Sequence, residues 1–508
     1  MNKRTVILAG FIILKFILQW IAINPVYELQ RDEYLHLDQA SHLAWGYISL
    51  PPFSSWVALL IKALGNGVFW VKFFPALFGV LTLVLVWKIM ETLQATTFAL
   101  CLGATAIVFS VLIRINTLFQ PNSSDILFWT LFYYVIIKYI SSNNIKWLYA
   151  VGVVTGIGLL SKYNFAFLLI GILPALLLSA QRKLFLKKEF YFAIGIAFII
   201  VLPNITWQYQ HHFPTLRQLN ELARTQLDNV NRIDFVKEQF LFFISALIVI
   251  IAGFAALLLY KPFKPYRFLV LAYAITIAVY IYLRAKGYYA IGLYPVLIAF
   301  GSVYLGNVLQ EGRKKYLQPV LIVLIAGLGI PLLLIALPYK SPEQIMTDST
   351  WYKKLGLLRW EDGKDHALPQ DFADMIGWKE LAAKTDSVYA ALPDKENTLV
   401  LCDNYGQAGA INYYSSFKDI NAVSMNADYI NWIPLDKTIN NIILVKFHTD
   451  KDPERQRERP AFEKVSLKGK IENPNALERG AAIYLLEHAK IPINSIIAAE
   501  INKYKEAK

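Results

Sequence analysis

Long apolar runs separated by short polar loops fill the first two thirds of this 508-residue sequence. A helix of about 20 apolar residues is long enough to cross the hydrocarbon core of a bilayer. The runs therefore predict a polytopic α-helical membrane protein with about eleven transmembrane helices. The runs are Thr5–Ile23, Val68–Met90, Phe98–Ile113, Ile126–Ile140, Trp147–Leu160, Phe165–Ala180, Phe190–Trp207, Phe240–Tyr260, Phe268–Leu283, Ile291–Val308 and Val320–Leu337.

The charge of the chain is divided in the same way. Residues 1–339 contain 27 Lys and Arg but 12 Asp and Glu, whereas residues 340–508 contain 23 and 25. The net charge of +13 therefore comes from the apolar part. We attribute it to membrane topology and to attraction by lipid phosphates, and we expect no nucleic-acid binding. Cys101 lies in an apolar run and Cys402 in the soluble part, so no disulfide framework is expected.

The basic loops predict the topology. If the spans alternate, most basic loop residues fall on one side of the membrane, which places that side in the cytoplasm. The N-terminus is then cytoplasmic, its first apolar run is an uncleaved helix, and the C-terminal part is extracytoplasmic. We expect a multi-pass protein of the plasma (inner) membrane. The basic loop residues are Lys3, Arg4, Lys88, Lys138, Lys146, Arg182, Lys183, Lys187, Lys188, Lys261, Lys264, Arg267, Arg313, Lys314 and Lys315.

The composition changes abruptly after Pro338. Helical patterns alternate with strand-like runs from Lys340 onward, which predicts a small α/β layer domain. Two domains are expected: a transmembrane catalytic domain at 1–339 and an extracytoplasmic soluble α/β domain at 340–508. The expected helices are Gly377–Leu392, Tyr405–Phe417 and Ile493–Lys505, and the expected strands are Thr398–Cys402, Ile442–Phe447, Lys464–Gly469 and Ala482–Leu486. The glycines at 406–410 indicate helix packing, because their spacing does not match a nucleotide fingerprint.

The loop after the first run, Glu28–Trp56, is acidic. It contains four of the 12 acidic residues before residue 340: Glu28, Asp32, Glu33 and Asp38. Acids beside a membrane are costly and are often functional. A short amphipathic interfacial helix is expected from Asp32 to the Pro51-Pro52 pair. Asp32 and Glu33 are candidate catalytic residues; the alternative is that Asp32 caps this helix.

Cations also occur in the loops assigned to the outer face, against the usual tendency. Arg114, Lys162, Arg284 and Lys286 lie there. They either pair with the acids of the first loop or bind an anionic group such as a phosphate at the membrane surface. Their number favours the phosphate.

Several motifs resemble a known family. The stretch RDEYLHLDQASHLAWGYISLPPFSSW resembles the first extracytoplasmic loop of glycosyltransferase family 39-like membrane proteins. This group includes protein O-mannosyltransferases and lipid A aminoarabinose transferases and has the GT-C fold. The stretches QPNSSDILFW, LLSKYNF, LPNITWQYQHHFP, KGYYAIGLYP and DNYGQAGAINYY are also similar. One departure is Leu50, where many members have His or Lys.

The resemblance implies a polyprenyl-phosphate sugar donor and transfer to a lipid, glycan or protein at the outer membrane face. Asp32 would be the general base, with Glu33 beside it. Arg114, Lys162, Arg284 and Lys286 would bind the donor phosphate. The remaining substrate-loop candidates are His36, Asp125, His211, Arg217 and Tyr288.

The resemblance implies the chemistry of an inverting hexosyl- or pentosyltransferase of the cell envelope. A base removes the acceptor proton, and cations stabilise the leaving phosphate. We expect no cofactor and no metal, although a divalent ion beside carboxylates and phosphate would be plausible chemistry. His36 and His42 are interpreted as interfacial side chains rather than metal ligands. The alternatives are a transporter or flippase of an anionic lipid-linked sugar, or a ligase that moves a whole oligosaccharide.

Overall fold

The apolar runs form helices in the computed structural model, which describes residues 2–21, 23–225, 230–360 and 362–506. The chain divides into two compact units. The helical unit comprises Met1–Ala22, Ala44–Val57 and Phe69–Leu337, and the α/β unit comprises Ile23–Leu43, Ala58–Val68 and Pro338–Lys508. The predicted two-domain division with one boundary after residue 339 stays a prediction. In the structure, two N-terminal segments group with the C-terminal part.

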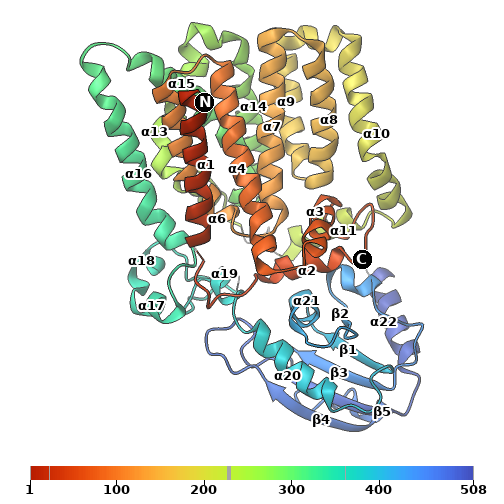
Figure 1. Ribbon diagram of the computed structural model, residues 1–508. Coiled ribbons are helices and arrows are strands. Elements are labelled where there is room, and N and C mark those ends of the chain that lie inside the picture. Colours follow the sequence, from red (N-terminus) through yellow and green to blue (C-terminus); the bar gives the residue numbers. More distant parts are fainter. Residues whose placement is uncertain (1, 22, 226–229, 361, 507–508) are drawn as a thin grey trace. The chain divides into compact units, whose positions relative to one another are not determined.

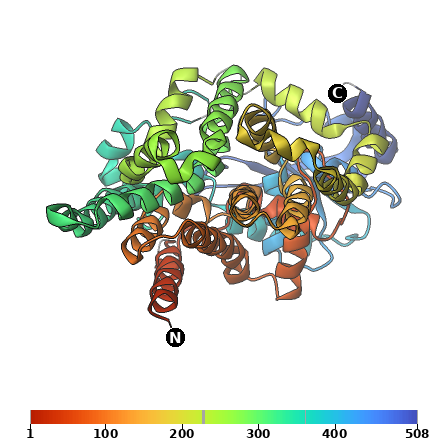
Figure 2. The same ribbon diagram turned by 90° about the horizontal axis from the view of Figure 1, so that it is seen from above.

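The helical unit is built from long helices that run side by side (Figure 1), and Figure 2 looks down on them. Its α-helices are α1 (Lys3–Ile21), α4 (Val68–Thr92), α5 (Thr97–Val108), α6 (Leu112–Ile115), α7 (Pro121–Ser142), α8 (Ile145–Ser161), α9 (Phe165–Leu177), α10 (Lys188–Gln210), α11 (Pro214–Thr225), α12 (Arg232–Leu241), α13 (Leu247–Leu259), α14 (Phe268–Tyr282), α15 (Tyr294–Val308) and α16 (Leu317–Ala336). Short 3-10 segments are η1 (Ala180–Leu186), η3 (Ile244–Ala246), η4 (Lys261–Tyr266), η5 (Gly287–Leu293) and η6 (Gly312–Tyr316). Helix α3 (Phe53–Ala63) contributes residues to both units.

Several of these helices are long and apolar enough to span a membrane. Within the described residues there are 5 such helices, or up to 7 if each of two bent helix pairs is one span. Four shorter apolar helices, α3, α5, α8 and α14, accompany them. The prediction of a multi-pass membrane protein is confirmed, and the count of about eleven spans stays a prediction.

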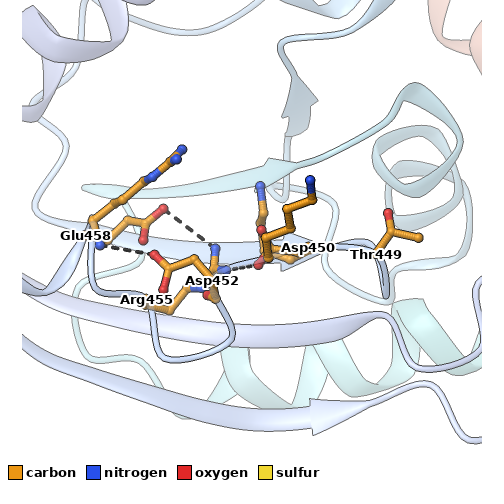
Figure 3. A pocket seen from close by; sticks show the side chains of 8 residues that line it. Thr449, Asp450, Asp452, Arg455 and Glu458 are labelled. Atoms are coloured by element: carbon orange, nitrogen blue, oxygen red, sulfur yellow. Dashed lines mark hydrogen bonds and ion pairs between the residues drawn. The ribbon is translucent and has the colours of Figure 1, made fainter.

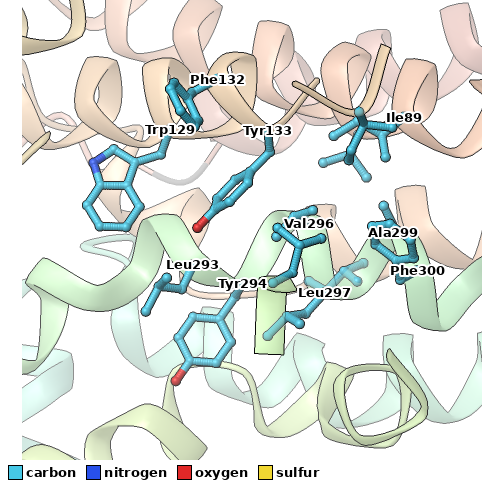
Figure 4. Packing of buried hydrophobic residues seen from close by; sticks show 14 of the residues in the cluster. Ile89, Trp129, Phe132, Tyr133, Leu293, Tyr294, Val296, Leu297, Ala299 and Phe300 are labelled. Atoms are coloured by element: carbon cyan, nitrogen blue, oxygen red, sulfur yellow. The ribbon is translucent and has the colours of Figure 1, made fainter. Parts of the chain in front are cut away.

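Tight packing of buried apolar side chains holds the helical unit together. Figure 4 shows Trp129, Phe132 and Tyr133 of α7 on one side of the cluster, and on the other side Leu293, Tyr294, Val296, Leu297, Ala299 and Phe300. Helices α13 and α15 approach closely at Gly253 and Gly301. A Cβ at either glycine would meet the backbone of the other helix, so the absence of a side chain allows the contact. Small residues at such contacts are typical of helix pairs in membranes.

The α/β unit contains one five-stranded sheet in the order β2-β1-β3-β5-β4. Strand β1 is parallel to β2 and β3, and β5 is antiparallel to β3 and β4. The strands are β1 (Thr398–Cys402), β2 (Ala422–Ser424), β3 (Asn441–Lys446), β4 (Phe462–Lys470) and β5 (Ala482–Ala489). Its helices are α2 (Arg31–Gln39), α17 (Pro342–Thr347), α18 (Ser349–Lys354), α19 (Gln370–Ala373), α20 (Trp378–Ala390), α21 (Tyr405–Tyr414) and α22 (Ile493–Glu506), with η7 (Ala427–Asn431) and η8 (Arg459–Ala461). The predicted α/β layer is confirmed.

Helix α2, which carries the acid pair, packs directly on α21. A Cβ at Gly406 would meet the side-chain stem of Arg31, and a Cβ at Gly409 would meet Tyr34 and Tyr429. The glycines of this segment therefore allow close helix packing, as predicted. Polar and apolar residues of α2 are buried alike, so the prediction of a simple amphipathic helix is wrong.

Candidate active site

The two adjacent acids of α2 have different surroundings. Gln30 is the N-cap residue: its side chain accepts a hydrogen bond from the Asp32 backbone nitrogen at 2.8 Å. Glu33 completes a capping box by accepting from the Gln30 nitrogen at 2.8 Å. The alternative that Asp32 is the cap is therefore wrong. Glu33 is fully buried, whereas the Asp32 side chain is 35% exposed.

The Asp32 carboxylate is held by a residue far along the chain. The Tyr405 hydroxyl donates a hydrogen bond to Asp32 Oδ1 at 2.6 Å. The Arg31 guanidinium lies 3.8 Å from the same oxygen and 5.4 Å from the centre of the Tyr405 ring. A hydroxyl donor and a cation both complement a carboxylate charge, so this acid is held in place without being fully buried.

Two further polar residues of α2, His36 and Asp38, have partners within the α/β unit. His36 is buried, its Nδ1 lies 3.3 Å from Gln39 Oε1, and burial lowers its pKa. The ring is therefore neutral at pH 7, and the prediction of an interfacial side chain is wrong for His36. Asp38 accepts hydrogen bonds from Asn412 and Tyr429, and burial raises its pKa to about 6.

A second polar cluster lies in the helical unit around Lys162, between α8 and α9. The Lys162 ammonium donates to Asn122 Oδ1 at 2.6 Å. It lies 5.4 Å from the ring centre of Tyr288 and 4.7 Å from that of Tyr289, which are cation–π distances. Lys286 acts electrostatically on Lys162. The structure thus brings together three predicted site residues: Lys162, Lys286 and Tyr288.

Asp125 belongs to a buried hydrogen-bond network in the same unit. Its carboxylate accepts from Trp129 Nε1 at 2.9 Å and from Asn164 Nδ2 at 2.7 Å. The Asn164 oxygen accepts from the Tyr280 hydroxyl at 2.7 Å, which connects α7 to α14. Asp125 also acts electrostatically on Lys162. This geometry makes Asp125 a structural link and a counter-charge.

The remaining predicted residues lie at other helix ends of the helical unit. Arg114 in α6 donates to Thr117 Oγ1 at 3.3 Å. Arg284 follows α14 with a left-handed backbone, φ 51°. His211 is exposed and stacks on Trp207 at 4.1 Å. Arg217 donates to the His212 carbonyl at 3.0 Å. Their assignment to substrate stays a prediction.

Sequence reasoning missed three polar residues with long-range partners: Lys15, Gln19 and Tyr405. Lys15 is fully buried in α1 and donates to Asn116 Oδ1 at 3.1 Å, while Gln19 donates to the Asn116 carbonyl. The sequence did mark Lys15, because it is the one charged residue in the apolar run from Thr5 to Ile21. Tyr405, the partner of Asp32, carried no such local signal.

The described residues form no evident metal site, and a hollow after β3 lies away from the predicted site residues. Across the described ranges, no group of three or more His, Cys, Asp or Glu residues is placed to hold a metal ion. Independence from metals and cofactors stays a prediction. A hollow of about 370 Å³ follows β3 (Figure 3), and none of the predicted site residues lines it. Its lining residues are Lys446, Thr449, Asp450, Lys451, Asp452, Arg455, Arg457 and Glu458.

Comparison with known sequences gives two matches. Residues 49–207 match the family model described as dolichyl-phosphate-mannose-protein mannosyltransferase. The lipid A galacturonosyltransferase RgtD of Rhizobium johnstonii is 22% identical over 195 residues, which are 37% of this chain and 41% of that protein. The chain therefore covers about two fifths of this curated relative. Asp32 lies before the stretch that the family model matches.

Solved structures resemble nearly the whole chain. ArnT from Cupriavidus metallidurans in the apo state has a TM-score of 0.66 at 11% identity, covering 97% of this chain and 99% of ArnT. The same protein bound to undecaprenyl phosphate has a TM-score of 0.64 at 12% identity, covering 94% and 98%. An oligosaccharyltransferase from Archaeoglobus fulgidus has a TM-score of 0.52 at 11% identity, covering 88% and 69%. These structures show that the chain has the GT-C fold, and the sequence matches confirm its resemblance to the glycosyltransferase family 39-like group.

Proposed function

We propose that this protein transfers a sugar from a polyprenyl-phosphate donor to an acceptor hydroxyl with inversion at the anomeric carbon. The observation that carries the proposal is the pair Asp32 and Glu33: Glu33 is occupied in a helix cap, and Asp32 is a partly exposed carboxylate held by Tyr405. One positioned base suits direct displacement, whereas retaining enzymes use two carboxyl groups, one of them as nucleophile.

The proposed step is a single displacement. The acceptor oxygen attacks C1 of the sugar while Asp32 takes the hydroxyl proton. The bond between C1 and the phosphate oxygen breaks, and its electron pair stays on the polyprenyl phosphate. The products are the glycosylated acceptor, the polyprenyl phosphate and a protonated Asp32, which then releases its proton to water.

We assign the donor phosphate to the cations of the helical unit. Lys162 donates to the neutral Asn122 and lies beside two tyrosine rings; the carboxylate of Asp125 offsets part of its charge, and Lys286 adds a second positive charge. Such a group attracts an anion and stabilises the charge that develops on the leaving phosphate. Arg114 and Arg284 are further candidates. The structurally similar ArnT binds undecaprenyl phosphate. We propose that the lipid part of the donor used by this protein is of the same kind.

The proposal places the reaction at the outer face of the plasma membrane. The alternation of basic loops supports a cytoplasmic N-terminus and an extracytoplasmic C-terminal part. The names of the relatives include both lipid A and protein acceptors, so we propose a lipid, glycan or protein hydroxyl as acceptor. No nucleic acid, cofactor or metal is part of the proposed reaction.

Lipid and glycan mass spectrometry on cells with and without the gene tests the proposal. Cells that lack the gene should lose one envelope sugar and accumulate its polyprenyl-phosphate form, and the purified protein should transfer that sugar in detergent. An unchanged set of lipids and glycans would contradict the proposal. A flippase would also cause accumulation, but its purified form would transfer nothing. A ligase would move an oligosaccharide rather than one sugar.

A further inference from the structure

Tyr405 occupies a special place in the sheet of the α/β unit. Strand β1 ends at Cys402, Asn404 caps α21 by accepting from the Gln407 nitrogen at 3.0 Å, and Tyr405 is the first helical residue. Strand β1 lies between β2 and β3 in the sheet. The chain first adds β2 on one side of β1 and then crosses to add β3 on the other side, so the strand order reverses at β1. Functional groups in open α/β sheets gather outside the carboxyl ends of strands at such a switch point.

The contact between Tyr405 and Asp32 is short. At 2.6 Å the hydroxyl and the carboxylate have the spacing of a charge-assisted hydrogen bond. Burial and the neighbouring Asp32 raise the pKa of Tyr405 well above its ordinary value. The hydroxyl therefore keeps its proton over the working pH range and remains a donor to the carboxylate.

The packing around this contact leaves little freedom. Gly406 lacks a Cβ at the point where the Arg31 stem passes, so α2 can lie close enough for the tyrosine to reach Asp32. At the other end of α2, Asn412 and Tyr429 bind Asp38 at 2.7 and 2.6 Å. Both ends of the helix are thus fixed to the α/β unit, which sets the position of the Asp32 carboxylate.

We infer that Tyr405 is a positioning residue for Asp32, so that the contact between α21 and α2 within the α/β unit sets the position of the proposed base. This inference rests on the proposed function. The tyrosine fixes the rotation of the carboxylate, and the carboxylate takes the acceptor proton. A base that is misplaced or free to rotate loses part of its rate advantage.

The test is the full-length Tyr405→Phe protein in detergent, assayed with the polyprenyl-phosphate sugar that cells lacking the gene accumulate. We expect kcat to fall about 10- to 100-fold, the range for losing a hydrogen bond to a charged group, with little change in the KM for the donor. Tyr389→Phe is the matched control, because the Tyr389 hydroxyl donates to another carboxylate of the same unit, Asp419, at 3.1 Å. It should keep the wild-type kcat.

A double-mutant cycle separates positioning from a general structural effect. If Tyr405 acts through Asp32, adding Tyr405→Phe to Asp32→Asn should cost no further rate. A further fall by the same factor as in the single variant would overturn the inference. Rates are normalised to the sites that bind undecaprenyl phosphate, so partial unfolding does not appear as lost catalysis. Replacing Tyr405 with 4-aminophenylalanine, which keeps a donor on the ring, should restore most of the lost kcat, and no rescue would also overturn the inference.

The failure of the inference and that of the proposed function give different results. Wild-type kcat in Tyr405→Phe together with a large loss in Asp32→Asn would overturn the inference and leave the proposed function standing. Wild-type transfer by Asp32→Asn would remove the proposed base itself.

Discussion

Two buried or partly buried aspartates illustrate how differently the two units use a carboxylate. Asp125 in the helical unit has both oxygens in hydrogen bonds, to Trp129 and Asn164, and is buried. Asp32 in the α/β unit accepts a hydrogen bond from Tyr405 and lies beside the Arg31 guanidinium, and about a third of its side chain is exposed. Each acid is fixed in place, but only Asp32 has surface on which a substrate could be met. Hydrogen bonds hold both carboxylates in place, so the exposed surface of Asp32 is what distinguishes this catalytic candidate from the structural Asp125.

Asp125→Asn should destabilise the protein if Asp125 has the structural role that this comparison gives it. An amide has one acceptor oxygen, so one of the two donors that now bind Asp125 must lose its partner. We expect a loss of about 1–3 kcal/mol in the free energy of unfolding, seen as a lower melting temperature of the purified protein in detergent. An unchanged melting temperature with lost transfer would instead make Asp125 a catalytic group.

Lys162→Gln should weaken use of the donor without unfolding the protein. The substitution removes a positive charge that we assign to the donor phosphate, while its amide can still donate to Asn122. We expect kcat/KM for the donor to fall about 10- to 100-fold, measured at sub-saturating donor. Lys353→Gln, at an exposed lysine of the α/β unit, is the control. Wild-type kcat/KM in Lys162→Gln would place the phosphate elsewhere.

The α/β unit should lose stability as the pH rises from about 4 towards neutrality. Burial raises the pKa of Asp374 from its ordinary value of 3.8 to about 7, so the folded state holds this proton more tightly than the unfolded chain. Stability must then fall as pH rises between these two values, and it levels off above about pH 8. The melting temperature should decrease by a few degrees between pH 5 and 7.5, and less in Asp374→Asn. An equal decrease in both proteins would contradict the assignment to Asp374.

Much of the fold could be predicted from local patterns. The apolar runs form the helices of the helical unit, and β1 covers Thr398–Cys402 as predicted. Strand β2 was missed because it has three residues, too few for an alternating pattern. Lys15 was missed because the apolar run around it dominated the interpretation of α1.

The candidate site was predictable only in part, for a physical reason. The acid pair of α2 and the cations stand out as charges beside apolar runs. The partner of Asp32 is 373 residues away, and no periodicity links residues at that distance. The different roles of Asp32 and Glu33 also depend on geometry, because adjacent acids look alike in sequence until one of them is seen in a cap.

The rate of sugar transfer by purified Asp32→Asn protein tests the central claim most directly. We predict a loss of about a hundredfold or more in kcat, with a melting temperature close to wild type and with undecaprenyl phosphate still bound. Glu33→Gln is the matched comparison, because its amide oxygen can still accept from Gln30 and keep the cap; it should lose far less activity. Normal transfer by Asp32→Asn, with transfer lost in Glu33→Gln, would contradict the assignment and make Glu33 the base.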